Sequence, residues 1–406
     1  MSYFRFNSTL IFGIIGTTLI ASALLIEIVN GRFWLNDFKV MYSAASAYIS
    51  ADPVYGVSFG LNSGFYKYSP FTLLFFIPYT FISFKAACII HFLLIGFCAL
   101  SSIIFIEKII RLFFSPVRKK QVLPLLAVLL CVINPLAREL HLGNINVLLV
   151  FVLTLSLYCT LSKKPMISGA LLAFAILAKP YFLLCILPLI VHKRYPAVLS
   201  TIGLIIAFVL CSAFLMEPSR CVLLYQEWVS AMMEHNNYLS SQHTIFSILH
   251  SYFGIFIPAK YALNVLGIIG LLSSLYFYMI NTAIKAKRPS FSKSENQHLI
   301  IHFYLLIAIV PSILITDTEH FIFTLPCIAL LLFHLKKNSI WAMISFIALL
   351  FMYGGNSSEL LGKNLSDEFS KWGVLGISNL IIVGTVFFWF KKEYLPRKNE
   401  GLKTDS

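Results

Sequence analysis

The chain has 406 residues, of which 59% are hydrophobic and only 12% are charged, against roughly 25% charged in soluble domains. Its mean hydropathy is +0.84, and this composition excludes an ordinary soluble protein. The formal net charge of +14 does not indicate nucleic acid binding, because the lysines and arginines form short clusters between apolar runs. Such clusters are typical of cytoplasmic loops in membrane proteins.

Long apolar runs predict transmembrane helices, because about 20 apolar residues are needed to cross a bilayer. The first run continues past Ala21-Ser22-Ala23, which resembles a signal peptidase site, so we expect an uncleaved anchor. In chain order the predicted spans are 8–30, 86–107, 122–137, 144–162, 168–179, 180–192, 196–216, 261–283, 299–316, 321–335, 339–354 and 373–390.

One further apolar segment does not fit this series. Ser69 to Phe84 contains Pro70 and Pro78, and it would be only about 22 Å long as a helix. We expect it to be re-entrant or interfacial and held against protein. The sequence thus predicts an all-α, polytopic transmembrane helical bundle with 11 to 13 spans, forming a single integral membrane domain over residues 1–406.

Basic clusters set the sidedness of this bundle, because cytoplasmic loops are enriched in lysine and arginine. We expect the basic tail 391–406 to be cytoplasmic and the long loops 31–69 and 217–259 to be extracytoplasmic. Both loops are rich in aromatic and polar residues, so we expect short juxtamembrane helices there. The other clusters expected in the cytoplasm are Arg118-Lys119-Lys120, Lys163-Lys164, His192-Lys193-Arg194, Lys285 to Arg288 and Lys336-Lys337.

Asp37 is the first candidate for chemistry. It follows the first span and lies between Trp34 and Phe38 in an aromatic loop. A carboxylate in this position could act as a general base toward a substrate held at the membrane surface. The alternative is structural, since an aspartate can cap the helix that follows it.

The junction between two predicted spans gathers polar residues. Arg138, His141, Asn144 and Asn146 lie within nine positions, close to the start of the span 144–162. A helix N-terminus offers free N–H groups and a partial positive charge, which suit a phosphate. The alternative is a solvated polar loop.

Two further candidates lie at breaks between apolar runs. Lys179, in Ala178-Lys179-Pro180, could bind a phosphate or could be a snorkelling anchor. His320 follows Asp317 and Glu319 in a short turn and could donate a hydrogen bond to a phosphate or a sugar hydroxyl. It could equally be an ordinary turn residue.

The second long loop carries aromatic side chains and amides, including Trp228, Gln242 and His243. Sugar rings stack on aromatic faces and hydrogen-bond to amides, although an ordinary interfacial loop has the same composition. We expect no metal and no cofactor, because seven of the eight cysteines lie in apolar runs and none has metal-ligand spacing.

Several short motifs follow one another along most of the chain: Asp37-Phe38, Tyr42-Ser43-Ala44-Ala45, Asp52-Pro53-Val54-Tyr55, Tyr68-Ser69-Pro70-Phe71, Gly143-Asn144-Ile145-Asn146, Ala178-Lys179-Pro180 and Glu319-His320-Phe321. In this order they resemble the GT-C glycosyltransferases of family 87, the polyprenyl-phosphate-mannose-dependent α-mannosyltransferases. The chain departs from that family at Gly143-Asn144, where Gly-Gln is usual. Ser241-Gln242-His243 matches the family's polar motif only in part.

The resemblance implies an inverting transferase that moves a hexose, mannose by family default, from a polyprenyl-phosphate-sugar donor to a glycolipid or glycan hydroxyl. The alternation of spans and basic clusters places the candidate residues on the extracytoplasmic side, and the residue types suggest the plasma (inner) membrane. By resemblance Asp37 would be the general base, and Lys179 and His320 would contact the donor phosphate. Arg138 is a further candidate for stabilising that phosphate as it leaves. The candidates for substrate binding are Tyr42, Tyr68, His141, Asn144, Asn146, Gln242 and His243.

The main alternative is a transporter or flippase for a lipid-linked sugar, and a ligase for a lipid-linked polymer is another. Transporters often have repeated halves and broken helices around a midplane site, whereas the polar residues here gather at the ends of spans. A nucleotide-sugar enzyme is not indicated, because the sequence has no glycine-rich phosphate loop of the Rossmann type.

Overall fold

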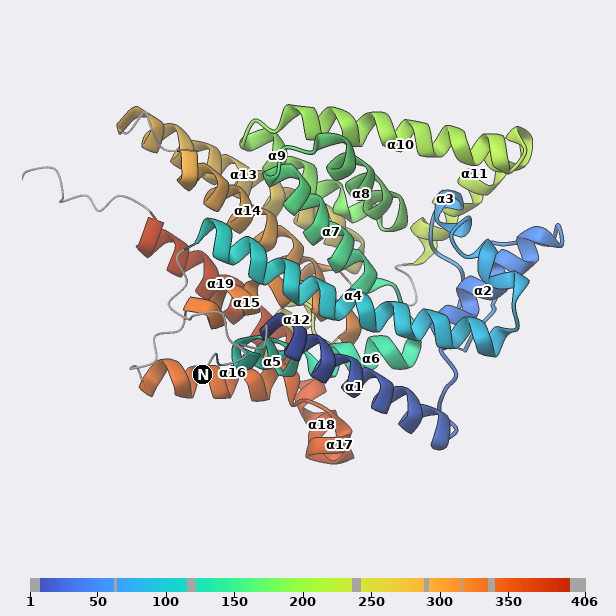
Figure 1. The fold of residues 1–406 in the computed structure, drawn as a ribbon, viewed down its shortest axis with the longest axis horizontal. Coiled ribbons are helices and arrows are strands. Elements are labelled where there is room, and N and C mark those ends of the chain that lie inside the picture. The colour runs from blue at the N-terminus through green and yellow to red at the C-terminus, as the bar shows by residue number, and fades with distance from the viewer. Residues whose placement is uncertain are drawn as a thin grey trace, which may run out of the picture.

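The computed structural model describes residues 8–61, 64–114, 122–235, 242–287, 292–314, 317–334 and 340–394. Within these ranges the chain consists of helices and connecting loops, with one isolated bridge between Ser58 and Phe65 (Figure 1). The predicted all-α fold is confirmed.

Six helices in the described ranges are long and apolar enough to cross a membrane. A seventh span results if α5 (Val122–Cys131) and α6 (Ile133–Leu142), which are bent by 64°, cross together. The six long helices are α1 (Ser8–Val29), α4 (Phe84–Phe113), α10 (Tyr195–Leu215), α13 (Ala262–Lys287), α14 (Ser292–Ile313) and α19 (Val374–Tyr394). The chain is therefore a multi-pass membrane protein.

The other predicted spans are shorter apolar helices, and the expected number of 11 to 13 spans is reached only by counting them. α7 and α8 are packed inside the bundle, α7 against α4 and α8 against α10. The bounds of these helices are α7 (Asn146–Leu161), α8 (Pro165–Ala178), η2 (Pro180–Cys185), α9 (Ile186–Val191), η4 (Thr318–Thr324), α15 (Leu325–His334) and α16 (Ile340–Gly354).

The proline-containing segment 69–84 does not form one continuous helix. It folds as α3 (Pro70–Leu73) and a 3-10 helix, η1 (Ile77–Phe81). Pro70 begins α3, whose first turn is capped when the Ser69 hydroxyl accepts the Thr72 N–H. All four residues of α3 are buried, and they pack against α8 and α10. α3 is thus held against protein, as expected, whereas η1 contacts α2 and α4 but has no buried residue.

The two long loops are helical, as expected, and they pack against each other. The first contains α2 (Asn36–Ile49), and the second contains α11 (Pro218–His235), α12 (Ile245–Phe253) and η3 (Ala259–Tyr261). The Arg220 guanidinium on α11 donates to the Tyr48 carbonyl at 2.8 Å and lies over the Tyr48 ring. In Figure 1, α2, α3 and α11 gather at one end of the bundle, at the right of the view.

Two short helices, α17 (Ser358–Leu361) and α18 (Lys363–Lys371), join α16 to α19. Some of the predicted cytoplasmic clusters lie outside the described residues: Arg118-Lys119-Lys120, Arg288, Lys336-Lys337 and the tail after residue 394. The expected tail domain 391–406 is therefore described only at its start.

Candidate active site

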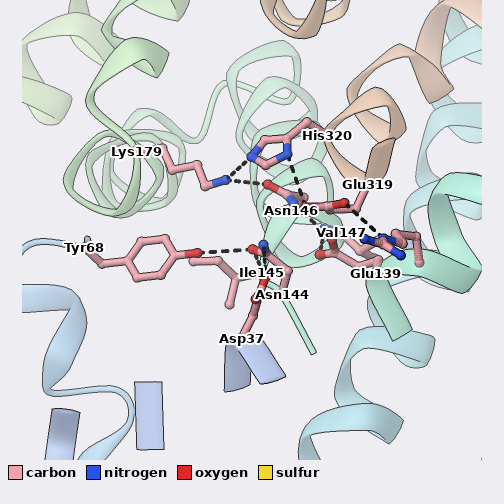
Figure 2. Close-up of polar contacts among 11 residues, drawn as sticks. Asp37, Tyr68, Glu139, Asn144, Ile145, Asn146, Val147, Lys179, Glu319 and His320 are labelled. Atoms are coloured by element: carbon pink, nitrogen blue, oxygen red, sulfur yellow. Dashed lines mark hydrogen bonds and ion pairs between the residues drawn. The ribbon is translucent and has the colours of Figure 1, made fainter. Parts of the chain in front are cut away.

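Five separate parts of the chain meet beside the start of α7. They are the first turn of α2, the loop before α3, the junction between α6 and α7, the break between α8 and η2, and the first turn of η4. Figure 2 shows their polar side chains converging on the short segment Asn144-Ile145-Asn146. Two connected clusters result, one around Asp37 and one around Lys179.

Asp37 lies in the first turn of α2, where the helix dipole favours a negative charge. It is not the N-cap of this helix, so the capping alternative is wrong. That position belongs to Leu35, which has a left-handed backbone (φ 41°) and provides no side-chain cap. The Asp37 carboxylate instead accepts a hydrogen bond from Nδ2 of Asn144 at 2.7 Å. Its partner therefore comes from a distant part of the chain.

The Asn144 amide is held in a fixed orientation. Its Oδ1 accepts the hydroxyl of Tyr68 at 3.1 Å and the backbone N–H of Ile145 at 2.7 Å. This leaves its N–H to face Asp37. The preceding residue, Gly143, has φ +69°, and a Cβ there would lie 2.8 Å from Cβ of Phe38. Glycine thus permits α6 to end and the junction to approach α2 closely.

The environment of Asp37 adjusts its acidity. Partial burial raises the pKa of the Asp37 carboxyl, while the Asn144 amide and the positive charges of Lys67 and Lys179 oppose that rise. A carboxylate with a raised pKa is a better proton acceptor once it is ionised. Burial also raises the pKa of Tyr68 well above its usual value, so the phenol stays protonated and donates to Asn144.

Lys179 is buried and is directed into the protein rather than toward a membrane surface. Helix α8 ends just before it, because Pro180 lacks an N–H and disfavours helix at the preceding residue. The Lys179 ammonium donates to Oδ1 of Asn146 at 2.5 Å and to Nε2 of His320 at 3.0 Å. The geometry does not support the snorkelling alternative.

Glu139 is a site residue that the sequence interpretation did not select. Its buried carboxylate accepts Nδ2 of Asn146 and the backbone N–H of Val147, both at 2.9 Å. A carboxylate from α6 thus already occupies the start of α7, where the sequence suggested a phosphate. The available signal was an ionisable side chain between two apolar spans, which is costly unless it is paired.

Glu319, His320 and Arg138 complete the second cluster. The ammonium of Lys179 can only donate, so Nε2 of His320 accepts and the ring proton is on Nδ1. Nδ1 lies 3.6 Å from Oε1 of the buried Glu319 carboxylate. Nε of Arg138 lies 4.0 Å from the other carboxylate oxygen, and the Arg138 side chain is 54% exposed. Arg138 is therefore the solvent-facing cation of the group.

Lys67 is a second missed residue. It precedes Tyr68, and its backbone carbonyl accepts the indole N–H of Trp228 on α11 at 3.0 Å. Partial burial lowers the pKa of Lys67, and the negative charges of Asp37, Asp317 and Glu319 oppose that effect. Lys67 thus adds positive charge on the side of the site formed by the first loop.

Four predicted substrate-binding residues lie away from these contacts. The Tyr42 hydroxyl donates to the Ile82 carbonyl at 3.1 Å, and Nδ1 of His141 lies 2.9 Å from Oε2 of Glu27 at the end of α1. Gln242 is exposed, and its backbone carbonyl lies against Gly373. His243 packs edge-on against Phe321, and burial lowers its pKa to about 4, so it adds no positive charge near pH 7.

The site therefore combines a carboxylate, Asp37, with a buried ammonium, Lys179. Alternate side chains of one short segment, Asn144 and Asn146, hold these two groups. Within the described residues there is no group of three or more histidines, cysteines or acids that could hold a metal ion. Acid–base chemistry next to a bound anion is what these residues can perform.

Comparison with known proteins places the chain in a family. The sequence profile of glycosyltransferase family 87 matches residues 65–316, which is more than half of the chain. The matched range contains Tyr68, Asn144 and Lys179, whereas Asp37 and His320 lie outside it.

An α-(1→3)-arabinofuranosyltransferase of Corynebacterium glutamicum is 28% identical over 173 residues. This similarity covers 42% of the present chain and 40% of that protein, so it spans well under two thirds of the relative. Together with the extent of the profile match, it leads to one conclusion: the chain belongs to glycosyltransferase family 87.

Proposed function

We propose that this protein is an inverting glycosyltransferase that moves a sugar from a polyprenyl-phosphate donor to a hydroxyl of a glycolipid or glycan. One observation carries the proposal. Asn144 and Asn146, two residues apart, contact a carboxylate and an ammonium, respectively. Such a transfer needs one group to accept the hydroxyl proton and another to balance the charge of the departing phosphate.

In the proposed reaction Asp37 accepts the proton of the acceptor hydroxyl as its oxygen attacks the anomeric carbon. The bond from that carbon to the phosphate oxygen breaks, and its electron pair stays on the polyprenyl phosphate. Lys179 stabilises the resulting charge, with His320 beside it and Arg138 at the exposed edge. The prenyl chain remains in the bilayer throughout.

Inversion needs only one carboxylate, which acts as the base. A retaining mechanism requires a second carboxyl group about 5 Å from the first to act as a nucleophile. The other two buried acids of the site have neighbours of their own. Glu139 accepts hydrogen bonds from Asn146 and Val147. Glu319 lies 3.6 Å from His320 and 4.0 Å from Arg138. Asp37 is therefore the acid that we assign as base.

The transferred sugar has two candidates. The family resemblance favours a hexose, with mannose as the first to test. The name of the corynebacterial relative, an arabinofuranosyltransferase, makes a pentofuranose the second. Both would present a phosphate to Lys179, so the site residues described above serve either one.

The proposed site faces the extracytoplasmic side of the plasma membrane. The basic cluster His192-Lys193-Arg194 directly precedes α10, a 21-residue helix, which is about 32 Å long. α11 follows at the other end of that helix, together with α2 (Figure 1). Because basic clusters favour the cytoplasm, α2 and Asp37 are expected outside.

A transporter or flippase for a lipid-linked sugar remains the alternative to test. It would carry the donor across the bilayer unchanged and would need no base. Membership in a glycosyltransferase family and the pairing of Asp37 with an oriented amide both favour transfer.

The test uses purified protein with radiolabelled polyprenyl-phosphate sugars, including mannose and arabinofuranose, and a membrane lipid extract as acceptor. Wild type, Asp37→Asn and the matched control Asp52→Asn, whose side chain is exposed, are compared. We expect wild type and the control to consume one donor and folded Asp37→Asn to consume none. Full activity in Asp37→Asn would show that Asp37 is not the base. Movement of intact donor across liposome membranes without sugar transfer would favour the flippase.

A further inference from the structure

The contacts of Lys179 suggest how its charge is kept available. Its two hydrogen-bond partners, Oδ1 of Asn146 and Nε2 of His320, are both neutral acceptors. Each of these partners has a carboxylate next to it on its other side: Glu139 accepts from Asn146, and Glu319 lies 3.6 Å from His320. Among the described residues no carboxylate lies within 4.0 Å of the Lys179 ammonium. The lysine is thus surrounded by acids but contacts none of them.

The orientation of the Asn146 amide follows from its neighbours. An ammonium has only donors and a carboxylate has only acceptors. Asn146 therefore presents its oxygen to Lys179 and its N–H to Glu139, and the reverse orientation would break both contacts. Figure 2 shows the amide lying between the two groups.

Glu139 is itself fixed by the helix that it contacts. One carboxylate oxygen accepts the Val147 N–H at the start of α7, and the positive end of the helix dipole stabilises its charge. The other oxygen holds Asn146. Glu139 therefore has two roles that can be separated, capping α7 and orienting the Asn146 amide.

We propose that Glu139 is a positioning residue for the donor phosphate: it orients Asn146 so that a neutral amide oxygen holds the Lys179 ammonium and leaves its charge for the phosphate. This inference rests on the proposed function, because it assumes that Lys179 binds the donor. A carboxylate in direct contact with Lys179 would compete with the incoming phosphate, since charged partners form stronger hydrogen bonds than neutral ones.

Two variants separate orientation from capping. In Glu139→Gln, the side-chain oxygen can still accept the Val147 N–H. The new NH2 group, however, is a donor and would face the N–H of Asn146, which is also a donor. The amide must turn, and its N–H then faces Lys179. In the double variant Glu139→Gln with Asn146→Asp, donors and acceptors match again and the total charge is unchanged. A carboxylate now contacts Lys179 directly.

The measurement is binding of a fluorescent short-chain polyprenyl phosphate by purified full-length protein in detergent, with thermal unfolding recorded for each variant. A matched control is Glu107→Gln, a buried glutamate paired with Arg111 on α4. We expect Glu139→Gln to weaken binding about tenfold or more. The double variant should recover thermal stability but still bind more weakly than wild type, and the control should bind normally.

Several outcomes would overturn the inference. Wild-type binding by folded Glu139→Gln would show that the orientation of the Asn146 amide does not affect polyprenyl phosphate binding. Wild-type binding by the double variant would show that Lys179 does not need a neutral partner, and this result decides the matter even if Glu139→Gln fails to fold. If wild type itself binds no polyprenyl phosphate, the proposed function fails and the inference falls with it.

Discussion

Each of the two polar clusters of the site contains an asparagine, and the two asparagine amides point in opposite senses. Asn144 presents its N–H to the carboxylate of Asp37, whereas Asn146 presents its oxygen to the ammonium of Lys179. The difference lies in what holds the other end of each amide. Donors from Tyr68 and Ile145 occupy the oxygen of Asn144, while Glu139 occupies the N–H of Asn146.

This comparison shows that the residues bound to the other end of each amide decide whether it offers its N–H to Asp37 or its oxygen to Lys179. The segment Asn144-Ile145-Asn146 connects the clusters, so the base and the cation share one short support. Asp37, in the first turn of α2, and Tyr68, in the loop before α3, are half-buried, whereas Lys179 is buried. The first three of the following predictions each alter one side and leave the other in place, and the fourth alters neither.

Removing the cation should have the largest effect. We expect Lys179→Met to lower the transfer rate by roughly 100-fold or more, because a preorganised charge at the leaving group is lost. Steady-state rates with the consumed donor measure this, and donor KM should rise as well. Lys260→Met is a matched control, since Lys260 lies in η3 and contacts only the ring of Tyr261 in the described contacts. A loss of less than threefold would contradict the role of Lys179.

Removing the amide that faces Asp37 should change the pH dependence. The Asn144 N–H stabilises the charged carboxylate, so Asn144→Leu should raise the pKa of Asp37 further. The base must be ionised, so the acidic limb of kcat/KM against pH should move to higher pH, and activity below the limb should fall. An acidic limb that stays in place, or moves to lower pH, would show that Asp37 is not the titrating base.

Removing the phenol behind Asn144 should have a smaller effect. Tyr68→Phe deletes one hydrogen bond to Oδ1, which still accepts the Ile145 N–H. We expect about a fivefold loss of rate, the change that corresponds to ~1 kcal/mol for one neutral hydrogen bond. The acidic limb should shift in the same direction as in Asn144→Leu but less. Equal shifts in both variants would mean that Tyr68 alone controls the amide.

Removing a hydroxyl outside both clusters should leave catalysis unchanged. Tyr42→Phe loses the bond to the Ile82 carbonyl, which is worth about 1 kcal/mol of stability. The melting temperature should fall slightly while the transfer rate stays within about twofold of wild type, as expected when no contact with the reacting groups is lost. A large loss of rate without loss of stability would place Tyr42 in the substrate site.

The fold was largely predictable because hydropathy and length decide which segments can cross a bilayer. The bend between α5 and α6 was not, since the run 122–137 is continuous in hydropathy and the structure turns it at Val132. Helix α6 then continues to Leu142, which brings Glu139 onto the start of α7. A hydropathy pattern does not contain that change of direction.

The site was predictable where the residue type itself indicated chemistry. Asp37, Lys179 and His320 stood out as ionisable groups at the ends of apolar runs, and the structure brings the last two into contact. Asn144 and Asn146 were predicted to bind substrate, yet their amides are occupied by protein groups. Which partner a side chain meets depends on packing between distant segments, and the sequence alone does not show it.

The most direct test of this account is polyprenyl phosphate binding by Asp37→Asn that is folded and inactive in transfer. If the two clusters have separate roles, this variant should bind the carrier at least as tightly as wild type, because only the proton acceptor is lost. Loss of carrier affinity together with activity would contradict the division of the site into a base and a phosphate-binding cation.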